Sequence, residues 1–186
     1  METDEDLLTR SVREPTAFEP LVTRHARALH GYLARRAPDA VEDLLAEVWL
    51  QAFTGRETYD AKRGTPRMWL FGVARNVLLA HWRRRAYDVR ELPGDEAGSD
   101  PWHAVDDRLD AAAAGPQLRR SLARLPQLER ELLLLVAWEQ LTPTEAAAVV
   151  GISPGTARSR LFRARSRLRK EAHDSPQLLR LAGDFA

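Results

Sequence analysis

Apolar residues recur at three- and four-residue intervals along most of this chain, which is the spacing of helices that bury one face. Residues 15 to 36 show the pattern first. Its members are Phe18, Leu21, Val22, His25, Leu29, Tyr32 and Leu33. The spacing predicts a helix here, and the Pro38-Asp39 pair ends it because proline cannot continue the hydrogen-bond ladder.

Two further helices are expected in the first half. One covers residues 41 to 53 and ends at Gly55, and its stripe consists of Leu44, Leu45, Val48, Trp49 and Ala52. The other opens at Thr65-Pro66 and runs to about residue 86, through Trp69, Leu70, Val73, Ala74, Val77 and Leu78. No stretch alternates as a half-buried strand does, so the pattern predicts an all-α fold.

The pattern stops near residue 88, where acids and turn-forming residues take over. The acids are Glu91, Asp95, Glu96, Asp100, Asp106, Asp107 and Asp110. Helical spacing then returns, with helices expected over 117 to 125 and 128 to 140, on either side of Pro126. We therefore predict two small helical domains, 1–88 and 116–174, joined by a flexible acidic linker over 89–115 and followed by a tail over 175–186.

A helix-turn-helix is expected at the end of the second domain. Thr142 can cap a helix, Pro143 suits its first position, and Glu145 completes a capping box. Gly151 suits the left-handed position just past the helix end. Ser153 can then cap a second helix, so two helices are joined by a very short turn.

The second of these helices is strongly basic. Its cations are Arg158, Arg160, Arg163, Arg165, Arg167, Arg169 and Lys170. The predicted buried stripe consists of Ala157, Leu161, Ala164 and Leu168. A basic helix without an acid in its first turn is typical of a DNA recognition helix, whereas the alternative is a solvated helix that keeps the protein in solution. The acidic linker beside it either avoids or shields the DNA face, or is a plain solvated connector.

Composition narrows the class of protein. The chain has 186 residues, a net charge of +1, 44% hydrophobic residues and no cysteine, which excludes disulfides and cysteine-based zinc sites. No apolar run is long enough to cross a membrane, and the start METDEDLLTR lacks the apolar segment of a signal peptide, so we expect a cytoplasmic protein without membrane insertion. The five histidines have no metal-ligand spacing and no catalytic motif is present, so we expect no enzyme, no cofactor, no metal and no catalytic residue.

Three segments in order resemble one bacterial family. VEDLLAEVWLQAF at residues 41–53 and TPRMWLFGVARNVLLAHWRRR at 65–85 look like regions 2.2 and 2.3–2.4 of extracytoplasmic-function (ECF) sigma factors of the sigma-70 family. LPQLERELLLL at 125–135, with GISPGTARSRLFRAR at 151–165, looks like their region 4. There are three departures. Val77, Leu78 and Leu79, which follow Ala74-Arg75-Asn76, are less polar than in many relatives. Ala46 stands where a glutamine often precedes the glutamate, and Gln140 replaces a common glycine, so we expect that helix end to be satisfied differently.

The resemblance implies a factor that binds core RNA polymerase, directs it to promoters and promotes DNA melting. The residues it implies for the −35 element are Thr156, Arg158, Ser159, Phe162, Arg163 and Arg165. For the −10 element and melting they are Arg67, Arg75, Asn76, Arg83, Arg84 and Arg85. Asp43, Glu47 and Leu50 are implied as contacts to the polymerase. The implied partners are promoter DNA, the clamp region of the largest polymerase subunit and the flap region of the second-largest, and the resemblance leaves open an anti-sigma factor.

The residues support these roles to different degrees. Asp43 and Glu47 are four apart, so they share one helix face, beside apolar Trp49 and Leu50. The aromatic residues Trp69, Phe71 and Trp82 can stack on unpaired bases, although aromatic residues at helical spacing are usually core, and we favour that interpretation for Trp69. Arg165 and Arg167 are expected to contact phosphates or solvent.

Two other classes of protein stay open from sequence. One is a helix-turn-helix regulator whose first domain senses a signal or dimerises. The other is an interaction protein that mimics a sigma factor. The arginine-rich end of the helix over 65–86 disfavours a sensing module, and the basic recognition helix disfavours a mimic.

Overall fold

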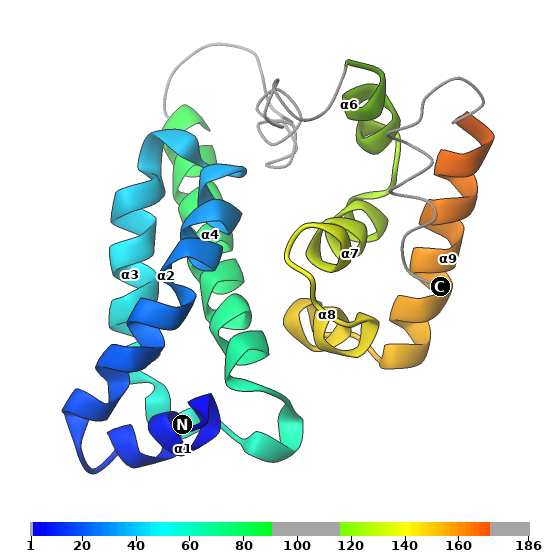
Figure 1. Cartoon of the computed structure of the whole chain (residues 1–186). Coiled ribbons are helices and arrows are strands. Elements are labelled where there is room, and N and C mark those ends of the chain that lie inside the picture. Colours follow the sequence, from blue (N-terminus) through cyan, green and yellow to red (C-terminus); the bar gives the residue numbers. More distant parts are fainter. Residues whose placement is uncertain (1, 91–115, 172–186) are drawn as a thin grey trace. The chain divides into compact units, whose positions relative to one another are not determined.

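The computed structural model describes residues 2–90 and 116–171, and every regular element in these ranges is helical (Figure 1). The described residues form two compact units, one on either side of the segment 91–115. The all-α, two-domain prediction is confirmed. The predicted linker, apart from its first two residues, and the tail over 175–186 lie outside the described residues.

The first unit contains four α-helices. They are α1 (Asp4–Ser11), α2 (Glu19–Ala34), α3 (Val41–Thr54) and α4 (Pro66–Arg90), with 3₁₀ turns at Pro15–Phe18, Pro38–Ala40, Arg56–Thr58 and Ala61–Arg63. Helix α3 packs against both α2 and α4, and α1 packs against α2 and α4 (Figure 1). The fourth helix continues to Arg90, beyond the expected end near residue 86, because no helix breaker intervenes.

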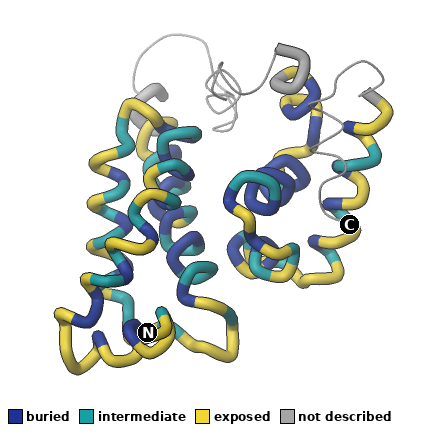
Figure 2. Tube along the Cα trace, viewed as in Figure 1, coloured by how far each residue is buried: buried dark blue, intermediate teal, exposed yellow. Residues whose placement is uncertain are grey.

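Most positions of the predicted stripes lie in the core of the first unit. The half-buried exceptions are Val22, Leu45, Trp49, Trp69 and Val73. The fully buried members of the core from α2 to α4 are Leu21, Leu29, Tyr32, Leu33, Leu44, Val48, Ala52, Leu70, Phe71, Ala74, Val77 and Leu78. Figure 2 shows buried, half-buried and exposed positions recurring along α2 and α3, whereas α4 is mostly buried or half-buried before Arg83. Phe18 meets Trp49 and Phe53 edge-on, with ring centroids 6.2 and 5.5 Å apart. Each buried large apolar side chain contributes about 1.5–3 kcal/mol to folding.

Helix α1 was not predicted from the sequence. It begins at a capping box in which the hydroxyl of Thr3 accepts from the backbone N–H of Asp6 at 3.2 Å, while the Asp6 carboxylate accepts from the Thr3 N–H. Leu7 and Leu8 are buried beneath it. Eight residues are too few to show a repeated stripe, so the sequence signals for this helix were the T-x-x-D box and the acids of its first turn.

One acidic side chain ties α1 to α2. The Asp4 carboxylate accepts a hydrogen bond from the Arg24 guanidinium at 2.6 Å and lies 2.6 Å from Nε2 of His25. Burial acts to raise the pKa of Asp4, but the hydrogen bonds from Arg24 and His25 outweigh it and leave that pKa below its ordinary value of 3.8. The charged carboxylate therefore stabilises the docked position of α1.

The second unit contains α6 (Pro116–Ala123), α7 (Gln127–Ala137), α8 (Pro143–Val150) and α9 (Pro154–Glu171). Helix α9 packs against the other three. The central run of α7 from Leu132 to Val136 is buried on all sides, which explains why it reads as a continuous apolar stretch. This packing holds α8 and α9 as a pair.

The chain after α7 bears on the expectation at residue 140. Gln140 adopts φ of 54°, the left-handed conformation that glycine takes without steric cost. The next N–H, of Leu141, bonds to the carbonyl of Leu135 at 3.2 Å. This acceptor lies six residues earlier, whereas the usual glycine closure bonds to a carbonyl five residues earlier. The helix end is therefore closed differently from the usual one, and Gln140 carries backbone strain.

Candidate nucleic-acid interface

The first helix of the predicted helix-turn-helix has both of its expected ends. The Thr142 hydroxyl accepts from the Glu145 N–H at 3.2 Å, and the Glu145 carboxylate accepts from the Thr142 N–H at 2.8 Å. Gly151 is left-handed with φ of 77°, and the N–H of Ile152 bonds back to the carbonyl of Ala147 at 3.0 Å. This closure lets the chain turn within three residues and enter α9.

The start of α9 is capped but not neutralised. Oγ of Ser153 accepts from the N–H of Thr156 at 3.2 Å, and the two hydroxyl oxygens lie 2.8 Å apart. The first turn contains no acidic residue. The partial positive charge of this helix end is therefore open to an anion such as a phosphate. Thr156 is half-buried, so its hydroxyl serves this turn first.

Helix α9 has a buried face and an exposed face, as predicted. Ala157, Leu161, Ala164 and Leu168 are buried. On the other side, Arg158, Ser159, Phe162 and Arg163 are exposed. Phe162 keeps 68% of its surface accessible, which is unusual for a large apolar side chain. An exposed aromatic ring between arginines is suited to contact with bases and sugars.

The later arginines of α9 differ from one another. Arg165 is half-buried, and burial, helped by neighbouring Arg169, lowers its pKa from the ordinary value of an arginine. Arg167 donates a short hydrogen bond to the carboxylate of Glu129 on α7. The expectation that Arg167 serves phosphate or solvent is therefore incomplete, because this buried carboxylate is its partner. Sequence reasoning missed Glu129, since nothing in the local spacing links α7 to α9.

The predicted polymerase face lies on α3. Asp43 and Leu50 are exposed, Leu50 to 64%, and Glu47 is half-exposed. The Glu47 carboxylate accepts hydrogen bonds from Gln51 at 3.0 Å and from Arg84 of α4 at 3.2 Å. Trp49, grouped with this face from the sequence, instead contacts Phe18 in the core. The face is thus acidic, with one apolar side chain on its surface.

The end of α4 is a basic cluster. Arg83, Arg84 and Arg85 are consecutive and all exposed, within the last three turns of α4. Burial lowers the pKa of nearby His81, the cations Arg85 and Arg84 lower it further, and Glu47 opposes them. Burial is the largest of these effects, and the two cations add to it.

The remaining candidates on α4 are less exposed. Arg67 and Arg75 are half-buried, and the Arg67 guanidinium lies 5.7 Å from the ring centroid of Phe71. Asn76 is exposed. Of these three residues, Asn76 is therefore the most accessible to a nucleic acid.

The structure corrects the aromatic assignments. Phe71 is 1% exposed and Trp82 is 6% exposed, so both belong to the core and neither can stack on a base. Trp69, expected in the core, is only half-buried and meets Tyr59 edge-on at 6.0 Å. Trp82 continues the buried positions Ala74 and Leu78 at four-residue spacing, whereas Trp69 lies at the edge of the buried stripe.

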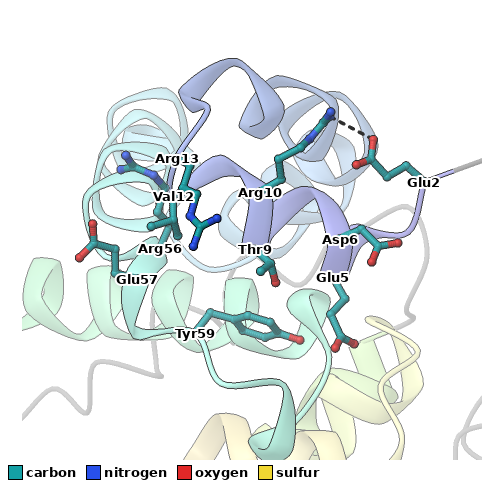
Figure 3. A pocket seen from close by; sticks show the side chains of 10 residues that line it. All are labelled: Glu2, Glu5, Asp6, Thr9, Arg10, Val12, Arg13, Arg56, Glu57 and Tyr59. Atoms are coloured by element: carbon teal, nitrogen blue, oxygen red, sulfur yellow. Dashed lines mark hydrogen bonds and ion pairs between the residues drawn. The ribbon is translucent and has the colours of Figure 1, made fainter.

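A separate hollow of about 900 Å³ lies beside α1 (Figure 3). Glu5 and Arg13 of α1 and its following turn face Arg56 and Tyr59 across it. Burial raises the pKa of Tyr59, and the negative charge of Glu5 adds to this effect. The hollow is lined by both acids and arginines, so its charge favours neither an anionic nor a cationic ligand.

Within residues 2–90 and 116–171, no group of three or more histidines and acids is placed to hold a metal ion. The helices in the same ranges include none with the length and apolar character needed to cross a membrane.

Comparison with known sequences gives two family matches. Residues 21–87 match Sigma-70 region 2, and residues 116–168 match Sigma-70, region 4. The ECF RNA polymerase sigma factor EcfG of Rhodopseudomonas palustris is 32% identical over 165 residues, which is 87% of this chain and 84% of that protein. The ECF RNA polymerase sigma factor SigF of Caulobacter vibrioides is 39% identical over 139 residues, covering 73% of this chain and 74% of that one.

Two solved structures share the fold. One is the sigma factor RpoE of Bartonella quintana in complex with the anti-sigma factor NepR, with a TM-score of 0.61, 21% identity, and coverage of 85% of this chain and 98% of the other. The second is CnrH in complex with the cytosolic domain of CnrY, with a TM-score of 0.61, 26% identity, and coverage of 91% and 96%.

Proposed function

The chain belongs to the ECF sigma factors of the sigma-70 family, which direct RNA polymerase to promoters, and we propose how its residues divide that task. A sigma factor is an initiation factor rather than an enzyme, because the polymerase does the chemistry. In our proposal the first unit binds the polymerase and the −10 element, and the second unit reads the −35 element.

The exposed face of α9 carries the proposal for the −35 element. Arg158 and Arg163 contact base edges, since an arginine can grip O6 and N7 of guanine. Phe162 packs on a thymine methyl group or a sugar, and its 68% exposure is the observation that supports this role best. Ser159 lies on the same face, and Thr156 and Arg165 contact the backbone phosphates nearby.

Helix α4 contacts the −10 element in this proposal. Arg83, Arg84 and Arg85 bind phosphates, which suits their exposure and their positive charge. Asn76 hydrogen-bonds to a base edge of the separated strand. Arg67 and Arg75, being half-buried, contact the strand only with part of their guanidinium groups.

The polymerase contact is proposed for α3. Asp43 and Glu47 meet cations on the clamp region of the largest subunit, and Leu50 fills an apolar pocket there. Charged residues at the rim of an interface set its register, and a buried apolar centre supplies affinity. The second unit contacts the flap region of the second-largest subunit.

Two further aspects belong to the same proposal. The chain acts in the cytoplasm, where the polymerase and the promoters are. An anti-sigma factor is a further partner, which is supported by the two structural relatives in complex with such proteins or their cytosolic domains.

Run-off transcription with purified core polymerase tests the proposed function. A pool of genomic promoters is transcribed with and without the full chain. We expect a defined subset of transcripts to appear only when the chain is present. Absence of any chain-dependent transcript, with core polymerase shown to be active on a nicked template, would contradict the proposal.

A further inference from the structure

The carboxylate of Glu129 is a buried acid in contact with the recognition helix. Its side chain is only 4% exposed, whereas the two arginines that it meets on α9, Arg163 and Arg167, keep 55% and 49% exposure. A buried carboxylate needs partners to offset its lost hydration. Here the acid is fixed in the protein interior, while the cations remain accessible to a ligand.

The local sequence explains why this carboxylate reaches across to another helix. Glu129 occupies the third position of α7, from which a glutamate usually turns back to the N–H of the capping residue. The capping residue is Pro126, which has no N–H, and no side-chain capping bond is formed. The carboxylate is therefore available to α9, and the start of the α7 dipole favours its charge.

The two arginines are engaged differently. Arg167 donates a hydrogen bond from a terminal nitrogen to Oε2 of Glu129. Arg163 lies four residues earlier on the same face, and its Nε is 3.9 Å from Oε1, which is an ion-pair contact rather than a hydrogen bond. This contact involves Nε of Arg163. The two terminal amino groups, which form the paired hydrogen bonds of an arginine to a base or phosphate, do not take part in it.

We propose that Glu129 is a positioning residue for DNA reading: it orients Arg163 toward the base edge and withholds Arg167 from the phosphates. This rests on the proposed −35 reading by α9. The recognition helix then gains one oriented base contact and loses one sequence-independent contact. Both effects raise the discrimination between promoters relative to the total affinity for DNA.

The test measures the salt dependence and the base preference of holoenzyme assembled from the full chain. Glu129→Gln keeps the shape of the side chain and removes its charge. We expect a steeper slope of log affinity against log salt, by about one unit between about 50 and 200 mM, because Arg167 is released to a phosphate. We also expect the preference at the base pair read by Arg163 to fall about three- to tenfold on a library randomised across the −35 element.

Companion variants separate this role from simple support of the fold. Arg167→Gln alone should leave the salt slope unchanged, because Arg167 contacts no phosphate in the wild type. Combining it with Glu129→Gln should return the slope to the wild-type value. A damaged fold would make the slope shallower, so a steeper slope that depends on Arg167 cannot come from lost structure.

Clear outcomes overturn the proposal. These are an unchanged or shallower slope for folded Glu129→Gln, or a slope about one unit shallower for Arg167→Gln. If Glu129→Gln does not fold, the salt slope of Arg167→Gln alone decides whether Arg167 contacts a phosphate. If Arg163→Ala leaves the base preference intact, the −35 reading proposed for Arg163 fails, and the slope measurements still decide whether Glu129 withholds Arg167.

Discussion

The carboxylate of Glu47 on α3 accepts a hydrogen bond from Arg84 on α4 at 3.2 Å. The first residue is proposed to meet the polymerase, and the second is proposed to meet promoter phosphates. Both side chains are solvent-accessible, with 31% and 60% exposure, so the pair itself contributes little to stability. Under this proposal the pair links the two contacts. Polymerase bound at Glu47 changes the charge that promoter DNA meets at Arg84, and DNA bound at Arg84 changes the charge that the polymerase meets at Glu47.

Reversing the acidic charges of α3 should weaken binding to core polymerase. In the double variant Asp43→Lys/Glu47→Lys, two attractive contacts become repulsive, and we expect at least a tenfold loss of affinity, or about 1.4 kcal/mol. Pull-down and titration with core enzyme measure this, with helicity checked by circular dichroism. Glu14→Lys/Glu57→Lys is the matched control, since both glutamates are exposed elsewhere on the same unit. Equal binding by the two double variants would contradict the assignment.

Truncating Leu50 should lower the affinity for core polymerase while leaving the stability of the fold nearly unchanged. Leu50→Ala removes a side chain that is 64% exposed, so the free energy of unfolding should change by less than about 0.5 kcal/mol. Affinity for core polymerase should fall by about 1–2 kcal/mol if Leu50 fills an apolar pocket. Val12→Ala, at 38% exposure on the same unit, is the control and should not alter binding. A similar affinity for both variants would remove Leu50 from the interface.

Replacing different arginines of α9 should change DNA binding in different ways. Arg158→Ala and Arg163→Ala should each cost about 1–3 kcal/mol on the best promoter and relax preference at one or two base pairs. Arg165→Ala should weaken all sequences alike and make the salt slope shallower by about one unit. Transcription on a library randomised across the −35 element measures the preference. If neither Arg158→Ala nor Arg163→Ala changes it, the base-reading roles are wrong, while membership of the family is unaffected.

Relieving the backbone at residue 140 should stabilise the second unit. Gln140 has a positive φ of 54°, so Gln140→Gly removes a steric penalty and should raise the free energy of unfolding by about 0.5–1 kcal/mol. Ala148→Gly, at an exposed position within α8, is the control with the opposite sign and should lower it by about 0.5–1 kcal/mol. Chemical denaturation measures both. A destabilising Gln140→Gly would show that the side chain is needed there.

Acid should loosen the attachment of α1. The pKa of Asp4 lies below its ordinary value of 3.8 in the folded chain, so its stabilisation is complete above that value and is lost as the pH falls through the folded pKa. We expect Asp4→Asn to be less stable than the wild type at neutral pH and the difference to shrink below about pH 4. Urea unfolding at several pH values checks this. A difference that stays constant with pH would show that the charge of Asp4 is not what matters.

Local features of the fold were predictable from sequence because they depend on neighbouring residues. The capping box of Thr142 and the left-handed Gly151 both rely on residues within one turn, and both are present. Contacts between distant residues were not predictable in this way. The bond from Arg167 to Glu129 spans 38 positions, and no spacing rule indicates it.

Because α1 packs against α2 and α4, the unit that folds together is longer than the segment that matches the family. The match to Sigma-70 region 2 begins at residue 21, yet Leu7, Leu8 and Phe18 are buried before it. Phe18 covers the rings of Trp49 and Phe53 in the matched part. A fragment that begins at residue 21 would expose these rings to water as an apolar patch and would tend to aggregate. Domain dissection of this protein should therefore start from Thr3, the residue that caps α1.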